Sequence, residues 1–468
     1  MNSPFDELKY KELLEGLEIS EVRLSELEYS WRLDSEYYRK YFLQIERSIF
    51  SKKHFSLSEI ADFLIGPFGS AFDTSNYIEN GKYRYVRGQD VKPFVLKDDD
   101  CRYVPESDFN RLSKYALKEK DVLVSVVGTL GNACIVQEKN LPAIFSCKST
   151  VIRTTKISPV VLLSYLNCKY GRELLLRKER GAIQKGLNLD DLKTMIIPCF
   201  TEEITSIIET AFYEAQSKLA ESKLFYSEAE DILLSELGLK GWQSNNNPIN
   251  IKQLKESFWA SGRLDAEYYQ TKYDEIESVI TKYKYGFDIV ENLFSQNTEV
   301  CDYKEEAYNY IEIGDINIGD GSANYNLVST ENLPDNAKRV LHKNDVLVSK
   351  VRPYRGAVSI IDFDDEKLIG SGAFTVLHEK TSYKKEVLQI LLRTQIYKDW
   401  LLKWNVGSSY PVIKDEDIMN LPIPLFPDTV QTKIAEYIQK SMSLRGEAKK
   451  LLDQAKRMVE KEIEEGGE

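Results

Sequence analysis

The chain has 468 residues, of which 42% are hydrophobic and 29% are charged, as expected for a globular protein of two or three domains. Its formal net charge of −12 at pH 7 argues by itself against nucleic-acid binding. No apolar run reaches membrane-spanning length, no basic and apolar leader is present, and the six cysteines occur singly, so we exclude membrane and disulfide-rich secreted proteins and expect a cytoplasmic one.

The first 31 residues form an acidic segment that ends at a short motif. Residues 32–38 read Arg-Leu-Asp-Ser-Glu-Tyr-Tyr, and nearly the same sequence returns at residues 263–269. We predict a short helix at both places. The first copy marks the start of a globular domain that we place at residues 32–200.

Residues 51–200 are basic within this acidic chain, with 23 Lys and Arg against 17 Asp and Glu. The net charge is −4 for residues 1–50, −6 for residues 201–250 and −5 for residues 281–427. This distribution favours DNA contact by the first domain. The acidic remainder suggests that other surfaces meet protein, or that partners supply positive charge.

Two early stretches of the first domain are candidates for DNA contact. Residues 66–72 read Gly-Pro-Phe-Gly-Ser-Ala-Phe, whose backbone amides could approach a phosphate, although a plain turn explains them equally well. Residues 82–87 interleave basic and aromatic side chains. Alternation on a strand places Arg84 opposite Tyr83 and Tyr85, so that one set forms core. The candidates here are Phe68, Gly69, Ser70, Lys82, Arg84 and Arg87.

A predicted buried strand and two later loops add further candidates. The apolar run 122–127 indicates the strand, and the glycine-containing loop 128–132 follows it. A helical pattern at 159–178 precedes residues 177–186, whose Gly, Gln and Lys suit hydrogen bonds to DNA phosphates; a flexible connector is the alternative. The candidates are Ser125, Thr129, Asn132, Arg180, Gln184 and Lys185.

Residues 201–245 and 428–468 each predict one long helix. Their apolar residues recur in alternating steps of four and three, and no proline interrupts either helical pattern. The first helix would extend on the order of 55 Å at ~1.5 Å per residue. We expect one antiparallel coiled coil that serves as spacer and partner-docking surface; the alternative is that each helix packs only on its own domain. The predicted seam consists of Ile204, Ile208, Ala211, Ala215, Leu219, Tyr226, Leu233, Ile434, Tyr437, Leu444, Ala448, Leu451, Ala455 and Met458.

The second half of the chain repeats the first. Residues 121–125, Asp-Val-Leu-Val-Ser, return at 345–349, and residues 191–198 match 417–424. Ordered matches at a nearly constant offset indicate a tandem duplication. We therefore predict a second α/β domain at residues 246–427, related to the first by pseudo-two-fold symmetry, with its own helical pattern at 384–403.

Two loops of the second domain are the counterparts of the loops named above. Residues 350–356 hold three cations, and arginine there could bind guanine bidentately or hold phosphates; a solvated loop is the alternative. Residues 404–410 take the place of residues 177–186. The candidates are Lys350, Arg352, Tyr354, Arg355, Ser408, Ser409 and Tyr410.

The sequence contains no recognisable catalytic constellation. His54, His342 and His378 are far apart in the sequence and have no metal-ligand spacing. We find no Walker sequence, dinucleotide fingerprint, nucleophile elbow or Asn-Pro-Pro-Tyr-type base-methylation motif. We therefore expect a non-catalytic protein with no metal and no cofactor of its own.

Taken together, these features resemble the specificity subunit of type I restriction-modification systems. The resemblance rests on the doubled order of motifs, the Gly-Pro-Phe-Gly-Ser-Ala-Phe loop, the strand at 121–125 with glycines after it, and Gln-Lys-Gly-Leu-Asn-Leu-Asp-Asp-Leu at 184–192. It covers nearly the whole chain. The second half departs from the pattern, because it lacks the Gly-Pro-Phe-Gly loop near 293–300, and Ser-Tyr-Pro at 409–411 replaces Gln-Lys-Gly.

This resemblance implies a non-catalytic subunit of a phage-defence complex. The two α/β domains would be target-recognition domains, each recognising one half of a bipartite site in double-stranded DNA. The long helices would fix the gap between half-sites and dock two methyltransferase subunits. Those partners would bind S-adenosylmethionine and methylate adenine at N6.

Several alternatives stay open at this point. The resemblance does not decide whether two restriction and translocation subunits join the complex, or whether the assembly is type I or type IIB-like. A self-contained methyltransferase or nuclease, and a scaffold that never touches DNA, are the competing classes of function. The recognised bases do not follow from the sequence.

Overall fold

The computed structural model describes residues 7–24, 27, 32–67, 71–78, 80–181, 185–243, 247, 249–406 and 410–465. Its internal contacts group the chain into two compact units. Unit 1 consists of Met1–Ser217 and Glu447–Glu468, and unit 2 of Lys218–Gly446. Both unit limits fall inside the long helices, so each unit joins a globular part to one segment of each helix. The predicted domain limits, 32–200 and 246–427, frame the globular parts and remain predictions.

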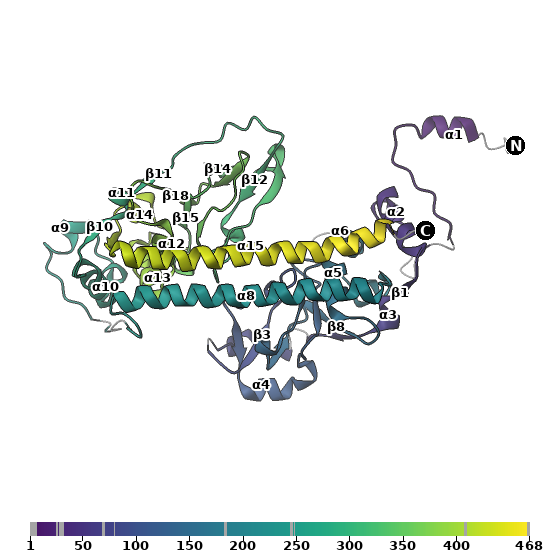
Figure 1. Cartoon of the computed structure of the whole chain (residues 1–468), viewed down its shortest axis with the longest axis horizontal. Helices are drawn as coiled ribbons and strands as arrows, with labels where there is room; N and C mark the ends of the chain where they lie inside the picture. The colour runs from purple at the N-terminus through teal and green to yellow at the C-terminus, as the bar shows by residue number, and fades with distance from the viewer. Residues whose placement is uncertain are drawn as a thin grey trace. The chain divides into compact units, whose positions relative to one another are not determined.

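The described part of unit 1 contains three β-sheets, with the orders β1-β9, β2-β8-β5-β6 and β4-β3-β7 (Figure 1). All four residues of β5 are buried, which confirms the buried strand predicted from residue 122. In the third sheet, β3 pairs with β7 in parallel and with β4 antiparallel. The strands are β1 (His54–Ser56), β2 (Ala61–Ile65), β3 (Tyr83–Val86), β4 (Arg102–Val104), β5 (Val122–Ser125), β6 (Ala133–Ile135), β7 (Ala143–Phe145), β8 (Ser149–Thr154) and β9 (Ile196–Pro198).

Unit 2 repeats this arrangement with one additional strand. Its sheet orders are β10-β19, β11-β18-β15-β16 and β13-β12-β17-β14, with β14 as an addition at one edge. β12 and β17 pair in parallel, as β3 and β7 do. The predicted duplication is confirmed. The strands are β10 (Phe287–Ile289), β11 (Phe294–Gln296), β12 (Ala307–Ile311), β13 (Asn326–Ser329), β14 (Ala337–Val340), β15 (Val346–Ser349), β16 (Val358–Ile360), β17 (Leu368–Ser371), β18 (Phe374–Glu379) and β19 (Pro422–Pro424).

Both units also contain short helices. Unit 1 has α1 (Glu7–Leu13), α2 (Lys40–Phe50), α3 (Leu57–Ile60), α4 (Glu106–Arg111), α5 (Pro159–Asn167), α6 (Lys169–Arg177) and α7 (Leu189–Lys193). Unit 2 has α9 (Phe258–Ser261), α10 (Thr271–Thr281), α11 (Val290–Leu293), α12 (Lys385–Arg393), α13 (Gln395–Leu401) and α14 (Asp415–Met419). In the part of the chain that the structure describes, no helix has the length and apolar character needed to cross a bilayer.

The regions with helical patterns, 159–178 and 384–403, are helical, and each forms two helices rather than one. Cys168 and Thr394 interrupt them with extended backbone, at ψ 165° and 151°. The side chain of Cys168 accepts from the amide of Gly171, and that of Thr394 accepts from the amide of Tyr397. Each interrupting residue therefore caps the N-terminus of the next helix, which a hydrophobic period does not reveal.

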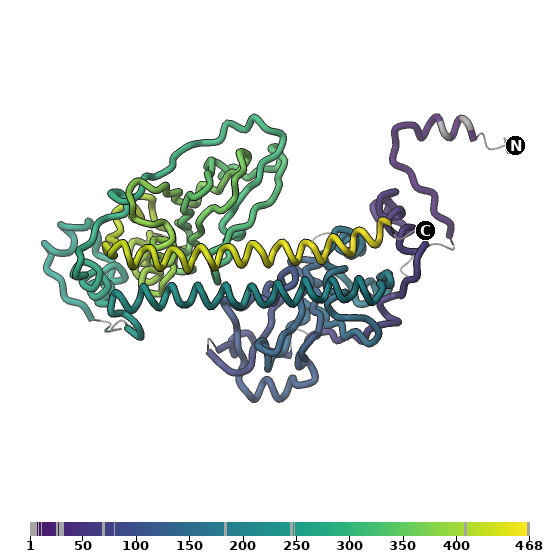
Figure 2. Tube along the Cα trace, in the orientation of Figure 1, coloured from purple at the N-terminus to yellow at the C-terminus, as the bar shows by residue number. Residues whose placement is uncertain are grey.

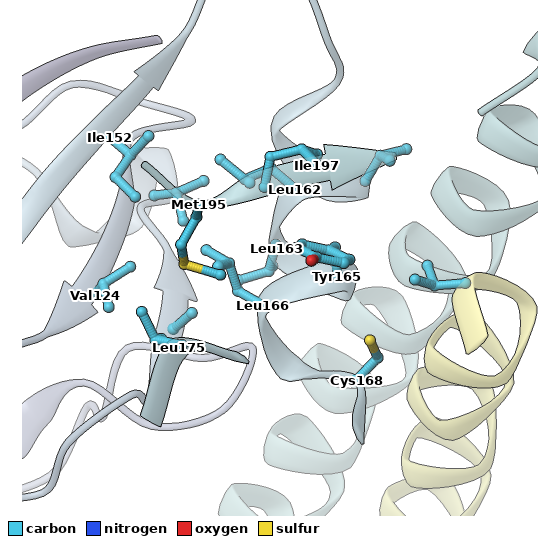
Figure 3. Packing of buried hydrophobic residues seen from close by; sticks show 14 of the residues in the cluster. Val124, Ile152, Leu162, Leu163, Tyr165, Leu166, Cys168, Leu175, Met195 and Ile197 are labelled. Carbon is cyan, nitrogen blue, oxygen red and sulfur yellow. The ribbon is translucent and has the colours of Figure 1, made fainter. Parts of the chain in front are cut away.

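The main core of unit 1 is built around α5, which is buried from Val160 to Asn167 (Figure 3). Leu162 and Leu166 pack in one cluster with Val124 and Ile152 of the central sheet. The same cluster includes residues of both long helices. The helix segments are therefore part of the core of unit 1.

The two long helices, α8 (Glu202–Glu236) and α15 (Asp428–Glu465), run without a break (Figure 2). In unit 1, the early residue Ile208 of α8 shares a core with the late residue Val459 of α15. In unit 2, the late residue Leu233 of α8 shares a core with the early residue Ile434 of α15. The predicted antiparallel pairing is confirmed.

The buried face of this helix pair is wider than the predicted heptad seam. Buried seam residues are Ile208, Ala211, Ala215, Leu233, Ile434, Leu444, Ala448 and Ala455. Half-buried seam residues are Ile204, Leu219, Tyr226, Tyr437, Leu451 and Met458. Ile438, Val459 and Ile463 lie outside the seam and are fully buried, because each helix packs on a globular part as well as on the other helix.

Candidate nucleic-acid interface

The repeated Arg-Leu-Asp motif fastens the chain just before a predicted contact loop in each unit. Arg32 donates from Nε to Asp34 at 2.8 Å and from a terminal nitrogen to the carbonyl of Glu179 at 3.2 Å. Its guanidinium carbon lies 4.5 Å from the ring centre of Tyr37. The hydrogen bond from Arg32 lowers the pKa of Asp34, so this carboxyl group is ionised at neutral pH.

Unit 2 uses the same contacts. Arg263 donates to Asp265 at 2.8 Å and to the carbonyl of Asn405 at 3.1 Å. The tyrosines of each motif lie on a single 3-10 turn, at Ser35–Tyr38 and Ala266–Tyr269, where we predicted a short helix. The motif thus fastens the backbone at Glu179 in unit 1 and at Asn405 in unit 2.

Loops that are remote in the sequence of unit 1 lie beside one another. The loop after β5 meets the segment after α6, and the glycines at 66 and 88 approach the β7–β8 turn so closely that side chains would collide there. A Cβ on Gly66 would lie 2.4 Å from the backbone of Ser146, and one on Gly88 would lie 2.8 Å from Cβ of Lys148. Val127 pairs with Gly186 as an isolated bridge. The loop after β5, the segment after α6, the two glycines and the β7–β8 turn therefore contribute to one surface of unit 1.

Unit 2 assembles the equivalent surface through three backbone hydrogen bonds. Lys350 donates from its amide to the carbonyl of Ala373 at 2.9 Å and accepts from the amide of Ile413 at 3.0 Å. The amide of Arg352 donates to the carbonyl of Pro411 at 2.7 Å. The loop after β15 is therefore fixed to the segment before α14, as the loop after β5 is fixed to the segment before α7.

Most of the predicted contact cations are already neutralised within their unit. The ion pairs are Arg87 with Asp90 at 2.8 Å, Arg180 with Asp191 at 2.8 Å, Lys350 with Asp415 at 3.0 Å, and Lys185 with Glu179. Paired cations offer less to a phosphate than free ones, because binding must compete with the internal carboxylate.

Arg84 is placed differently from our expectation for its strand. Its residue is only 6% exposed, and it pairs with Asp98 at 3.7 Å and donates to the carbonyl of Lys97. Tyr85 on the other side of β3 is buried too, because both faces of this strand are covered. Arg84 holds the fold of unit 1, and we do not retain it as a DNA contact.

Ser125 and Asn132 also serve the loop internally. Ser125 is fully buried; its hydroxyl donates to the carbonyl of Thr129 and accepts from the amide of Asn132. Asn132 donates to the carbonyl of Val91 at 3.2 Å. These bonds leave Thr129 exposed at the surface of the loop.

Three predicted cations, Lys82, Arg352 and Arg355, form no ion pair with any described residue. The guanidinium carbon of Arg352 lies 4.5 Å from the ring centre of Tyr410, and Tyr354 beside it is 37% exposed. Lys82 and Arg355 are exposed. Phe68, Gly69, Ser70, Gln184, Ser408 and Ser409 lie outside the described residues.

Sequence reasoning missed two cations of unit 1. Lys148 is exposed in the β7–β8 turn, at the meeting point of the loops, and has no carboxylate partner in the described part of the chain. Arg172 on α6 donates to the carbonyl of Gly131 at 3.2 Å and to Asn132 at 3.1 Å, and burial lowers its pKa. Neither lies in a recognisable motif, so only the folded arrangement identifies them.

Two of the three histidines, which are far apart in the sequence, lie against the same carboxylate in unit 2. His378 and His342 both lie against the buried carboxylate of Asp345, at 3.2 Å and 3.6 Å. The equivalent Asp121 of unit 1 is held by Arg153 at 2.7 Å instead. No group of metal-binding composition occurs among the described residues.

Residues 287–454, from β10 into α15, match the family model of the type I restriction modification DNA specificity domain. No curated protein matches the sequence. The chain is similar to the type I restriction-modification S subunit from M. genitalium, at 14% identity and a TM-score of 0.41, over 87% of this chain and 95% of that one. It is also similar to the HsdS subunit from Thermoanaerobacter tengcongensis, at 15% identity and a TM-score of 0.28, over 88% and 96%. Both TM-scores are below 0.5, so we base no argument on these two structures. The likeness to a DNA specificity domain rests on the family model, which matches residues 287–454.

Proposed function

We propose that this chain is the DNA-recognising subunit of a type I restriction-modification complex, a role that extends the specificity domain of residues 287–454 to the whole protein. Each unit would recognise one half of a split site in double-stranded DNA. The observation that carries the proposal is the duplication itself: two units with matching sheet orders each gather the same two loops onto one surface.

The chemistry of these surfaces suits DNA in two ways. Free cations such as Lys82, Lys148 and Arg355 can neutralise phosphates, which gives affinity without sequence preference. Polar and planar groups on the loops after β5 and β15 can hydrogen-bond base edges in the major groove. The two loops differ in sequence between the units, so the two half-sites would differ as well.

The reaction would belong to partner subunits. We propose that two methyltransferase subunits dock on the protein, bind S-adenosylmethionine and methylate adenine at N6. In unit 1, a shallow groove along the helix pair is lined by Ile207, Thr210, Leu451 and Gln454, and Tyr213 is 52% exposed. A groove that mixes apolar side chains with polar ones such as Thr210 and Gln454 suits an amphipathic helix of a partner. α8 and α15 would also set the gap between the half-sites.

Selection of DNA from a random library by the full chain with its methyltransferase partner tests the proposal. The expected product is a split motif, with two fixed half-sites and a constant unread gap. A selected pool with no motif would favour a scaffold that does not recognise DNA. A continuous motif would contradict recognition by two units.

Calorimetric titration of the purified chain with S-adenosylmethionine separates this role from an enzyme. We expect no binding to the chain alone and binding once the methyltransferase is added. Saturable binding by the isolated chain would identify it as a methyltransferase in its own right.

A further inference from the structure

We propose that Arg352 recognises a guanine in the half-site of unit 2 and that Tyr410 holds its guanidinium in position. This inference rests on the proposed function and names a base and a residue within it. Three independent features of the loop after β15 lead to it: its backbone conformation, the free donor edge of Arg352, and the aromatic ring beside it.

The backbone of Arg352 is left-handed, with φ 50° and ψ 54°. In unit 1, Gly128 follows the buried Ser125 at the same spacing at which Arg352 follows the buried Ser349, and it has φ 89°. Glycine adopts this conformation freely, whereas other residues pay free energy for it. The turn therefore does not need an arginine, and an arginine kept at a strained backbone position points to a functional use.

The donor groups of Arg352 have no competing partner. Its guanidinium forms no ion pair or hydrogen bond with any residue that the structure describes, whereas its neighbour Lys350 is paired with Asp415 at 3.0 Å. The amide of Arg352 is fixed to Pro411 at 2.7 Å, so the base of the side chain is held while its end is available.

Tyr410 orients the guanidinium group of Arg352. The guanidinium carbon of Arg352 lies 4.5 Å from the ring centre; Tyr410 is 56% exposed and Arg352 is half-buried. Stacking on an aromatic face engages the plane of a guanidinium and leaves its donor edge free. That edge matches O6 and N7 of guanine, which is the commonest specific contact of arginine in the major groove.

Arg355 provides a matched control on the same loop. It is exposed and has no carboxylate partner among the described residues, but no aromatic ring lies against it there. An unoriented cation of this kind suits a phosphate, which carries no sequence information. Arg352 and Arg355 should therefore respond differently to substitution.

Mapping of adenine methylation in DNA from cells that express the full chain with its methyltransferase tests this assignment. In Arg352→Lys and Arg352→Gly we expect one guanine position in one half-site to lose about 10-fold or more of its preference, with the other half-site and the gap unchanged. Arg355→Ala should lower methylation evenly at all sites and keep the motif. Tyr410→Phe should preserve the preference for guanine at this position, and Tyr410→Ala should weaken that preference.

Arg352→Gly also controls for folding, because glycine suits the left-handed turn and should keep or raise the thermal midpoint of the purified complex. An unchanged motif in both Arg352 variants would overturn the inference, as would an even loss like that of Arg355→Ala or relaxation at a position that is not guanine. If the wild-type complex yields no split motif, the proposed function fails instead, which is a different result.

Discussion

The two units place a tyrosine in the same part of the core from different helices. In unit 1, Tyr165 on α5 donates from its hydroxyl to the carbonyl of Ile196, the first residue of β9, at 2.8 Å. In unit 2, Tyr397 on α13 donates to Pro422, the first residue of β19, at the same distance. The residue that corresponds to Tyr397 in unit 1 is Gly171, three positions after the helix break.

This comparison separates what the duplication preserves from what it lets change. The acceptor at the strand end, the sheet order and the cap at the helix break are common to both units. Three features differ between the units: the residue whose side chain reaches the acceptor at the strand end, the partner of the buried aspartate, and the residue at the left-handed turn. The framework is thus fixed by backbone positions, and side chains can diverge provided that these positions remain satisfied.

Among the substitutions that test this comparison, we expect the largest loss of stability from Gly171→Ala in unit 1. A Cβ there would lie 1.9 Å from the carbonyl oxygen of Tyr165, a backbone atom that cannot move aside as a side-chain end can. We expect a loss of about 3 kcal/mol of stability in unit 1. Hydrogen exchange of the amides of β5 and β8 would measure it, with Tyr397→Phe in unit 2 as a milder reference. Unchanged protection in unit 1 would contradict the packing described above.

Next in size is the buried aspartate. Arg153→Met leaves Asp121 buried without its cation, which should cost unit 1 roughly 2 kcal/mol, below the value for a fully buried pair because Arg153 keeps some solvent contact. His378→Ala should cost unit 2 roughly 0.5 kcal/mol, because His378 is exposed and makes one contact with Asp345 at 3.2 Å, whereas Arg153 makes two hydrogen bonds to Asp121. Urea unfolding followed separately in each unit would compare them, and equal losses would show that the two aspartates are held alike.

A further comparison concerns a symmetric pair within unit 2. Ser222 and Ser441 are buried on the facing long helices, with hydroxyl oxygens 2.8 Å apart, and each donates to the other's carbonyl at 2.9 Å. We expect Ser222→Ala or Ser441→Ala to cost about 1 kcal/mol each, and the double variant less than the sum. Strict additivity in a double-mutant cycle would mean that the two serines do not act on each other.

The features predicted correctly are those that the sequence shows as a hydrophobic period or as an internal repeat. The run Val-Leu-Val at 122–124 is apolar and lies in a buried strand. The heptads predicted within 201–245 and 428–468 form paired helices over Glu202–Glu236 and Asp428–Glu465, so the first helix ends earlier than predicted. The capped break at Thr394 escaped prediction because one side-chain hydrogen bond outweighs an unbroken apolar pattern.

The candidate surface was predicted in outline only. The sequence located the loops after β5 and β15, but it could not show which cations are neutralised, because Asp191 and Asp415 reach Arg180 and Lys350 from other elements. Nor could it show that His342 and His378 share Asp345, since strand pairing brings residues 36 positions apart to one carboxylate. Such pairings are properties of the fold rather than of any local pattern.

Lengthening the helix pair tests the central claim most directly. Seven residues inserted in α8 beside Ser222 and seven in α15 beside Ser441 preserve the heptad and add about 10 Å of helix. At about 3.4 Å per base pair, the account predicts a methylated motif with the same two half-sites and a gap wider by about three base pairs. A gap that stays unchanged while both half-sites are still recognised would contradict it.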